Sequence, residues 1–337
     1  MNLKVLINGA GRIGKAILKQ LLENKDFEIV AINDINPYIN NIVYSINYDS
    51  TYGKLEDKFR IVENSYIQNS KSKIKILNYS SLMDIDLKGI DIIIDASGKK
   101  EDIKSLEKLP LKAIFLTHPN KDAHINLILG VNENKLDINI HKVISTSSCN
   151  ATSLLPALKL IDEKKEIIFG DIVTIHPLLN HQRVLDGNYV KSDTRDVDLN
   201  FEFGRSSTQN IIPSHTTTIK ACSYVIEKFN SELISSNSLR VPTDTVGAIN
   251  VTLFTKQAST KDEIKNLFID FEKNQKFPIV LNNFEALVSS DFKKEKYTTI
   301  VDHRYLEVKN NMIKLLLWYD NEWGYASKVV EILKLFR

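Results

Sequence analysis

The sequence feature that most constrains the fold is a glycine motif near the start of the chain. Leu3–Gly9 is a short apolar run ending in glycine, which is typical of a buried strand, and residues 9–14 read GAGRIG, a match to G-x-G-x-x-G. Lys15–Lys25 carries apolar residues at helical spacing, and Phe27–Ile35 reads as a second strand. This order of strand, glycine turn, helix and strand predicts the opening of a doubly wound α/β fold.

Each glycine of the motif has a task in binding a dinucleotide. Gly9 allows the tight turn, Gly11 lets a pyrophosphate approach the backbone, and Gly14 lets the helix pack close to the strand. Asp34 follows 20 residues after Gly14, where its carboxylate would accept hydrogen bonds from a ribose 2′-hydroxyl and repel a 2′-phosphate. We therefore expect NAD rather than NADP; the alternative is a glycine turn that binds no dinucleotide.

The remaining strand patterns divide the chain into two domains. Gly89–Gly98, Lys112–Pro119 and His141–Ser148 read as further buried strands of a parallel sheet. Beyond Cys149 the predicted strands are longer and richer in β-branched and aromatic residues, and helical patterns such as Thr217–Phe229 separate them.

This change of strand character gives the expected domain boundaries. We expect a Rossmann NAD-binding domain at residues 1–148, completed by a C-terminal helix at about 318–337. Residues 149–317 are expected to form an α+β catalytic domain with a mixed, largely antiparallel sheet.

Composition narrows the classes of partner. The net charge of +2 over 337 residues is too small to indicate nucleic-acid binding. No run approaches the roughly 20 apolar residues of a membrane helix, and the N-terminal apolar run is too short for a signal peptide. The two cysteines allow one disulfide at most, which a chain of this size does not need. We expect a cytoplasmic protein with no nucleic-acid partner, no membrane partner and no metal site.

One cysteine occupies a position that suits chemistry. Cys149 lies in STSSCNATSLLP, residues 145–156, between a β-like run and a helix-like run. The positive end of a helix favours thiolate, so we expect this position to activate the sulfur. A lone cysteine is otherwise more often a small buried hydrophobe, which is how we interpret Cys222 in its helical pattern.

Nine segments together resemble glyceraldehyde-3-phosphate dehydrogenase and its relative erythrose-4-phosphate dehydrogenase. They span nearly the whole chain and read INGAGRIG, VAIND, YDSTYG, ILGVNENK, SSCNAT, QNIIPS, LRVPT, VSSDF and WYDNEWGY. The resemblance implies a Rossmann domain that binds NAD and a mixed-sheet domain that carries the chemistry. It also implies a C-terminal helix packed on the first domain, a homotetramer, and a place in glycolysis.

The resemblance assigns the chemistry to Cys149 and His176. It implies that the cysteine attacks an aldehyde, while the imidazole lowers the thiol pKa, accepts a proton and steadies the oxyanion. Outside this context His176 would be read as an ordinary half-buried histidine.

The resemblance also implies the cofactor site. Asn321 matches the residue that holds the nicotinamide carboxamide, Tyr325 packs beside that ring, and Ser97 lies near the cofactor. The expected cofactor-binding set is Gly9, Gly11, Arg12, Ile13, Gly14, Asp34, Ser97, Asn321 and Tyr325.

Two anion sites known in the family depart from their usual pattern here. The site for the substrate phosphate keeps Arg240, but Leu179 and His181 stand where a Thr and an Asp are usual. The site for inorganic phosphate has Asn150 after the cysteine, and Thr217 replaces a familiar Gly. The expected substrate and phosphate set is Ser148, Asn150, Thr216, Thr217, His181 and Arg240.

A longer loop is the last departure from the family pattern. About nine extra residues, including Asp193–Asp198, lie within the loop at residues 188–204. In relatives this loop meets neighbouring subunits, so the tetramer geometry can differ.

Three functions remain open from the sequence. The leading one is NAD-dependent oxidation of a small, phosphorylated sugar aldehyde through a cysteine thiohemiacetal and thioester, in the manner of glyceraldehyde-3-phosphate dehydrogenase, with release of the thioester by phosphate or water. The second is oxidation of erythrose 4-phosphate or another aldehyde, with release of the acid by hydrolysis. The third is a non-catalytic NAD-binding scaffold.

Overall fold

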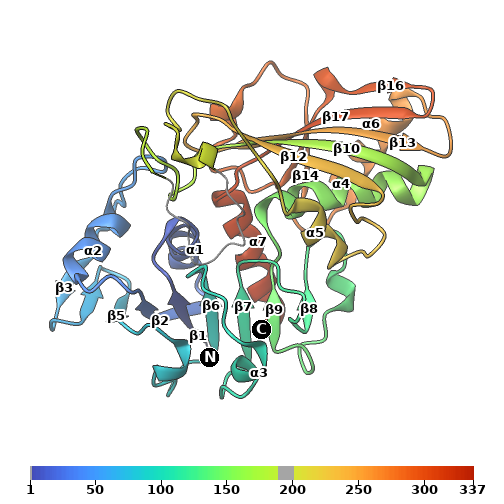
Figure 1. Cartoon of the computed structure of the whole chain (residues 1–337). Helices are drawn as coiled ribbons and strands as arrows, with labels where there is room; N and C mark the ends of the chain where they lie inside the picture. Colours follow the sequence, from blue (N-terminus) through green and yellow to red (C-terminus); the bar gives the residue numbers. More distant parts are fainter. Residues whose placement is uncertain (1, 189–200) are drawn as a thin grey trace. The chain divides into compact units, whose positions relative to one another are not determined.

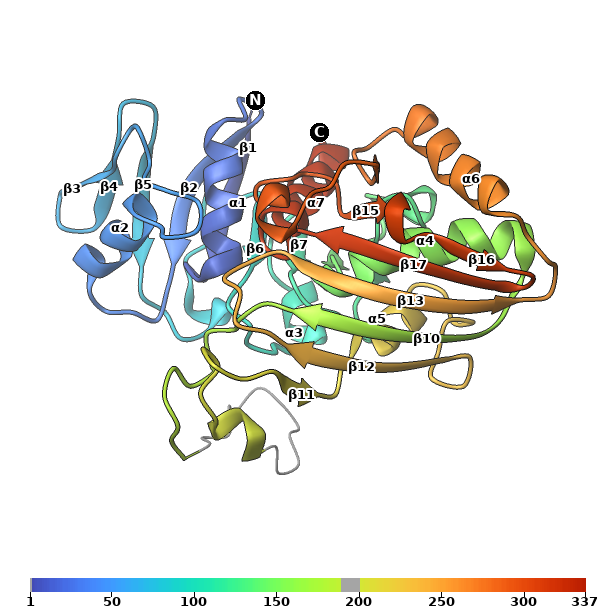
Figure 2. The same ribbon diagram turned by 90° about the horizontal axis from the view of Figure 1, so that it is seen from above.

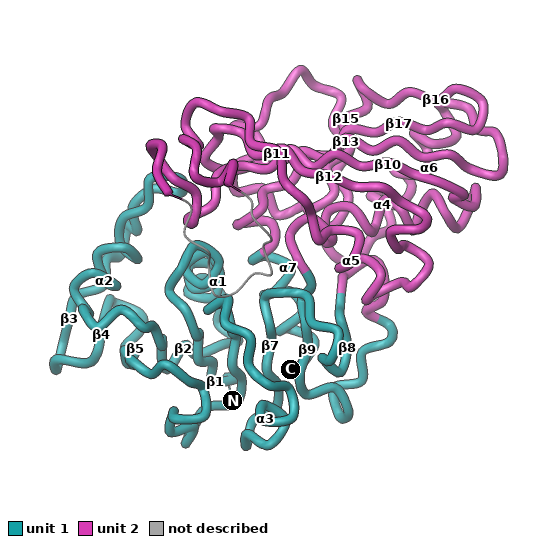
Figure 3. Tube along the Cα trace, viewed as in Figure 1, with its two compact units in different colours: residues 1–127, 134–147, 326–337 teal, residues 128–133, 148–325 magenta. Residues whose placement is uncertain are grey.

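The computed structural model describes residues 2–188 and 201–337, and within them the chain divides into two compact units. Unit 1 comprises residues 1–127, 134–147 and 326–337, and unit 2 comprises residues 128–133 and 148–325 (Figure 3). The predicted extra segment Asp193–Asp198 lies outside the described residues. Among the residues described, no helix is both long enough and apolar enough to cross a membrane.

Unit 1 is built around a nine-stranded sheet whose order is β3-β4-β5-β2-β1-β6-β7-β9-β8. Its strands are β1 (Leu3–Asn8), β2 (Phe27–Asn33), β3 (Arg60–Val62), β4 (Tyr66–Gln68), β5 (Lys73–Leu77), β6 (Ile92–Asp95), β7 (Ala113–Leu116), β8 (Ile125–Asn126) and β9 (Val143–Ser145) (Figure 1). All neighbouring pairs from β5 to β8 are parallel, and only the pairs β3-β4 and β4-β5 are antiparallel.

The central strands of this sheet are buried on both faces, as expected for a parallel sheet covered by helices. Every residue of β6 and β7 is buried. The helices lying wholly within the unit are α1 (Arg12–Leu22), α2 (Ile39–Asn47) and α3 (Ile103–Glu107). On α1 the apolar side chains of Ile17, Leu18 and Leu21 are buried.

The connectivity creates one position in the sheet where ligands bind in folds of this class. The strands β2 and β6 pair with opposite edges of β1, so the chain leaves β1 toward one side and later returns on the other. The carboxyl ends of the strands flanking such a reversal form the binding edge of a doubly wound sheet.

The C-terminal residues belong to unit 1. The helix α7 (Trp323–Leu333) begins in the residues of unit 2 and continues in those of unit 1. Beyond it, the ring of Phe336 packs edge-on against Phe115 of β7 with centroids 5.3 Å apart, and Arg337 pairs with Asp26 at 2.7 Å.

Unit 2 contains an eight-stranded sheet with the order β11-β12-β10-β13-β17-β15-β14, and β16 pairs with β17. Its strands are β10 (Ile167–His176), β11 (Ile212–Ser214), β12 (Ile234–Arg240), β13 (Gly247–Thr255), β14 (Val280–Asn283), β15 (Thr299–Asp302), β16 (Glu307–Lys309) and β17 (Met312–Tyr319). The long strands β12, β10, β13 and β17 lie side by side (Figure 2).

This sheet is mixed and largely antiparallel, which confirms the predicted fold class together with the parallel sheet of unit 1. Only the pairs β10-β12 and β14-β15 are parallel. The helices of the unit are α4 (Cys149–Lys165), α5 (Thr218–Ser223) and α6 (Lys261–Asn274). Helix α4 contacts β10, β13, β15 and β17, α5 contacts β12, and α6 contacts β14.

One predicted helix is wrong in length. The pattern Thr217–Phe229 indicated a continuous helix, but α5 ends at Ser223. The following residues form turns in which the N–H groups of Val225 and Ile226 both bond to the carbonyl of Cys222. Tyr224, Val225 and Ile226 are aromatic and β-branched residues of low helix propensity. Phe229 is buried in the core although the helix ends before it.

Candidate functional site

The glycine turn of unit 1 is packed so tightly that two of its glycines cannot be replaced without movement. Gly9 has a φ of +96°, and a Cβ atom there would lie 2.7 Å from the carbonyl oxygen of Ala96. A Cβ atom on Gly14 would lie 1.9 Å from the carbonyl oxygen of Gly9. At Gly11, by contrast, a Cβ atom would meet nothing within 4 Å, so open space adjoins the backbone where a pyrophosphate is expected.

The acidic residue predicted for ribose recognition lies against this turn. Asp34 follows β2, and its Oδ2 accepts the N–H of Ala10 at 2.7 Å while its Oδ1 accepts the N–H of Asn36 at 2.8 Å. These bonds hold the carboxylate beside the glycine turn. A carboxylate has about four acceptor positions, so two backbone donors leave room for ribose hydroxyls.

Arg12, the first residue of α1, is held by two neighbours. Its Nη1 pairs with Asp49 at 2.6 Å, and its guanidinium carbon lies 5.5 Å from the centre of the Tyr52 ring. Burial opposes ionisation of Asp49, but the backbone N–H of Tyr52 and the charge of Arg12 outweigh it and lower the pKa of the carboxyl below its usual value. The guanidinium is therefore oriented before any ligand binds.

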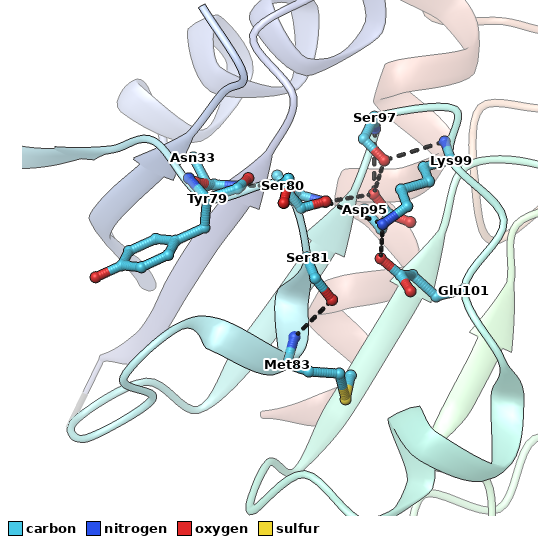
Figure 4. A network of polar contacts seen from close by, with 10 residues as sticks. Asn33, Tyr79, Ser80, Ser81, Met83, Asp95, Ser97, Lys99 and Glu101 are labelled. Carbon is cyan, nitrogen blue, oxygen red and sulfur yellow. Dashed lines mark hydrogen bonds and ion pairs between the residues drawn. The ribbon is translucent and has the colours of Figure 1, made fainter. Parts of the chain in front are cut away.

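A polar network joins the carboxyl ends of β2, β1 and β6. Asn33 donates to the side-chain oxygen of Asn8 at 2.7 Å, and Asn8 donates to Oδ1 of Asp95 at 2.8 Å. The hydroxyl of Ser97 donates to the same Oδ1 at 2.7 Å, and the N–H of Lys99 donates to that hydroxyl at 3.2 Å (Figure 4). Ser97 is exposed at the binding edge of the sheet, and its hydroxyl is bonded to the buried carboxylate of Asp95.

In unit 2, Cys149 is the first residue of α4. Ser148 is the N-cap residue, and its Oγ accepts the N–H of Ala151 at 3.3 Å, which explains why the helix begins here. The residue Cys149 is half-buried and its thiol is free. Its Sγ lies 4.0 Å from Nε2 of His176, the last residue of β10.

The orientation of His176 is determined by a backbone carbonyl. The side chain is 5% exposed, and its Nδ1 lies 2.8 Å from the carbonyl oxygen of Pro177. A carbonyl only accepts, so Nδ1 carries the proton in the neutral imidazole and Nε2 presents a lone pair to the sulfur. This tautomer is the one that can remove a proton from Cys149.

The helix start does lower the pKa of the Cys149 thiol, as expected, but it does not set the net direction of the shift. Burial raises the pKa of this thiol to about 11, although the backbone N–H of Asn150 and the charge of Arg240 act in the opposite direction. One helix terminus does not compensate for removing the sulfur from water. Burial therefore favours the thiol over the thiolate at this position.

Asn150 connects the nucleophile to two other elements. Its Oδ1 accepts the hydroxyl of Tyr319 at 2.6 Å and lies 3.5 Å from Sγ of Cys149. Its Nδ2 donates to Oγ1 of Thr218 at 3.1 Å, and Thr218 Oγ1 lies 2.6 Å from Oγ1 of Thr216. The amide expected to meet an anion is thus engaged with protein groups.

Three other residues expected to bind substrate or phosphate, Arg240, Thr217 and His181, lie on separate segments of unit 2. Arg240 ends β12 opposite His176 in the parallel register, and its charge acts on the Cys149 thiol. Thr217 is exposed and begins α5 as its N-cap residue. His181 packs against the ring of Phe203 with centroids 5.7 Å apart.

The residues expected to hold the nicotinamide are buried in unit 2. Asn321 is 5% exposed, and its Oδ1 accepts the hydroxyl of Thr245 and the N–H of Val246, both at 3.1 Å. The amide oxygen is therefore occupied, and the Nδ2 group is the part suited to meet a ligand. Tyr325 is 3% exposed in the first turn of α7.

Sequence reasoning missed three residues that contact the predicted ones. Tyr319 and Thr218 bind Asn150, and Asp95 binds Ser97. Tyr319 stands inside the quoted segment WYDNEWGY, so a signal was present, whereas nothing in the local pattern of Thr218 or Asp95 distinguishes it.

Comparison with known proteins gives consistent matches over the whole chain. The family model described as the NAD binding domain of glyceraldehyde 3-phosphate dehydrogenase matches residues 3–103, and that of the C-terminal domain of the same enzyme matches residues 148–321. The chain is 33% identical over 339 residues to glyceraldehyde-3-phosphate dehydrogenase 2 of Staphylococcus aureus strain Mu50, which covers 98% of this chain and 95% of the relative.

Two further relatives cover the same span. Glyceraldehyde-3-phosphate dehydrogenase 1 of Kluyveromyces marxianus is 32% identical over 336 residues, which are 98% of each chain. Glyceraldehyde-3-phosphate dehydrogenase 1 of Bacillus subtilis strain 168 is 29% identical over 337 residues, which are 98% of this chain and 97% of the relative.

Proposed function

Because the chain belongs to the glyceraldehyde-3-phosphate dehydrogenase family and is an NAD-dependent dehydrogenase, we propose that it oxidises a small sugar aldehyde through a covalent bond to Cys149. The observation that carries this proposal is the 4.0 Å contact between the Cys149 sulfur and the unprotonated nitrogen of His176. A nucleophile beside an oriented base is the arrangement that covalent catalysis requires. The preferred substrate class is a phosphorylated aldehyde, because Arg240 provides a guanidinium close to the thiol.

The first step forms a bond between sulfur and the aldehyde carbon. His176 takes the thiol proton through Nε2, the sulfur attacks the carbon, and His176 returns that proton to the former aldehyde oxygen, which gives a thiohemiacetal and a neutral imidazole. His176 then takes the hydroxyl proton as the carbon loses a hydride, which leaves a thioester on Cys149. The Nδ1–H bond to Pro177 keeps the ring in place through these transfers.

NAD supplies the electron acceptor when bound, because its nicotinamide ring takes the hydride with both electrons. The packing of Gly9 and Gly14 and the open space at Gly11 support a pyrophosphate over the glycine turn. Asp34 is assigned to the adenosine ribose. Ser97, Asn321 and Tyr325 are assigned to the nicotinamide half of the cofactor.

The acyl acceptor in the last step is either phosphate or water. Attack on the thioester carbon breaks the C–S bond and returns a proton to the sulfur, giving an acyl phosphate in the first case and a carboxylic acid in the second. Ser148 and Thr216 carry hydroxyls that suit a phosphate site. The alternative, a dehydrogenase for erythrose 4-phosphate or another aldehyde that releases the acid, is favoured by the commitment of Asn150 Nδ2 to Thr218.

One assay separates these possibilities. NADH formation is measured with glyceraldehyde 3-phosphate and with erythrose 4-phosphate, each in the presence and absence of inorganic phosphate. Turnover that requires phosphate supports the phosphorylating reaction, whereas equal turnover without phosphate supports hydrolysis. If no aldehyde gives an NADH burst equal to the enzyme concentration, the dehydrogenase proposal fails and a non-catalytic NAD-binding scaffold is favoured.

Assembly is part of the same proposal. Helices pack on one face of the unit 2 sheet, and the opposite face carries half-buried apolar side chains at Val173, Ile175, Phe254 and Leu316. Burying this face against a second copy would remove apolar surface from water. We assign this face to a contact within a homotetramer, and we assign the enzyme to the cytoplasm.

A further inference from the structure

The start of β13 lies beside the end of β17, and this pairing brings Thr245 next to Asn321. The two strands are antiparallel, with Gly247 opposite Tyr319 in the register (Figure 2). Thr245 comes shortly before the first residue of β13, and Asn321 comes shortly after the last residue of β17. Thr245 is 1% exposed and Asn321 is 5% exposed, so the contact between them is shielded from water.

The orientation of the Asn321 amide is fixed by a backbone donor. Its Oδ1 accepts the N–H of Val246 at 3.1 Å. A backbone N–H can only donate, so the atom that faces it is the amide oxygen, and Nδ2 lies on the other arm of the amide. Among the residues that the structure describes, this Nδ2 has no hydrogen-bond partner. The amide therefore offers a ligand its donor group and not its acceptor.

The hydroxyl of Thr245 makes a second bond to the same amide oxygen. Its Oγ1 lies 3.1 Å from Oδ1 of Asn321 and 3.4 Å from Oδ1 of Asp320. Both of these oxygens are acceptors, so Thr245 is the donor in either contact. Oδ1 of Asp320 already accepts the N–H groups of Glu322 and Trp323, at 3.0 and 2.8 Å. The hydroxyl proton therefore goes to the shorter contact, with Asn321.

Two donors that converge on one oxygen restrict an amide more than one does, because a single bond leaves the amide free to swing about it. We propose that Thr245 is a positioning residue, which holds Asn321 so that Nδ2 meets the carboxamide of the nicotinamide ring. A side chain that is held before the ligand arrives loses less conformational entropy on binding. This inference rests on the proposed function only in assigning Asn321 to the nicotinamide half of NAD.

The test compares the binding of NAD with that of ADP-ribose, which is the same molecule without its nicotinamide ring. Both dissociation constants are measured by isothermal titration on the full chain. Thr245→Val removes the hydroxyl and keeps the shape, so the Kd for NAD should rise about 3- to 10-fold, the value of one hydrogen bond, while the Kd for ADP-ribose stays the same. Thr245→Ser keeps the hydroxyl and should bind NAD within about twofold of the parent.

Thr255→Val is the matched control, at the opposite end of β13. Thr255 is 0% exposed, and its hydroxyl donates to the carbonyl of Gln257 at 2.8 Å. This variant loses a buried hydroxyl bond at a distance from Asn321, so its melting temperature should fall while both dissociation constants stay unchanged. The inference would be overturned by a Thr245→Val protein whose two constants rise together, as a loosened fold would produce, or whose Kd for NAD does not change.

Asn321→Ala separates this inference from the proposed function. If this variant loses affinity for NAD while Thr245→Val does not, the role of Thr245 alone is refuted. If Asn321→Ala binds NAD as the parent does, the assignment of Asn321 to the nicotinamide fails, and the inference about Thr245 fails with it.

Discussion

Replacement of His176 by Asn tests the central contact of the site, because it removes the base and leaves the sulfur in place. Burial raises the thiol pKa to about 11, so the sulfur needs a base to lose its proton near neutral pH. A positioned acid–base group contributes about 10²- to 10⁴-fold to a rate. The single-turnover rate of NADH formation should therefore fall by about 100- to 10,000-fold.

The pH profile gives the sign of this effect. Burial raises the pKa of the Cys149 thiol to about 11. The neutral thiol therefore predominates below that pH, and the fraction of reactive thiolate increases as the pH rises toward it. The Asn variant should therefore gain about tenfold in rate for each pH unit between 7 and 10, whereas the parent enzyme should be nearly flat above neutral pH. His141→Asn, the same chemical change at a residue of unit 1, serves as the control. A His176→Asn enzyme with the parent's stopped-flow burst, or with a flat profile, would refute the pairing.

Three further predictions concern packing, cofactor choice and assembly. Gly14→Ala forces a Cβ atom to within 1.9 Å of the Gly9 carbonyl, so urea unfolding should show a loss of about 1–3 kcal/mol or more; an unchanged midpoint would contradict the packing argument. Asp34→Asn removes the charge that repels a 2′-phosphate, so the ratio of Kd for NADP to Kd for NAD should fall at least about 10-fold by isothermal titration, and a constant ratio would reassign the carboxylate. Leu316→Glu places a charge on the sheet face that carries Val173, Ile175 and Phe254 and should reduce the mass found by sedimentation velocity, whereas an unchanged oligomer would place the contact elsewhere.

The first unit was predicted well because its signals are local. The apolar run of β1, the glycine turn and the apolar stripe of α1 follow one another along the chain, and each element is specified by its own residues. Gly9 needs a positive φ and Gly14 needs a close backbone approach, which are requirements that only glycine meets.

The second unit was predicted less completely because its decisive contacts join distant segments. The end of α5 at Ser223 depends on how the following apolar residues reach the core, which the helical pattern of Thr217–Phe229 does not report. Tyr319 lay within a quoted motif, but only the pairing of β17 in the sheet brings it to Asn150.

The amino-acid sequence alone determined the opening strand, glycine turn, helix and strand, and the location of Cys149 at a helix start, because steric limits and side-chain periodicity act over a few residues. Only the tertiary structure decided which groups surround the sulfur of Cys149 and which groups bond to the amide of Asn150. Both depend on burial and on hydrogen-bond partners up to 169 residues away, which no local pattern contains.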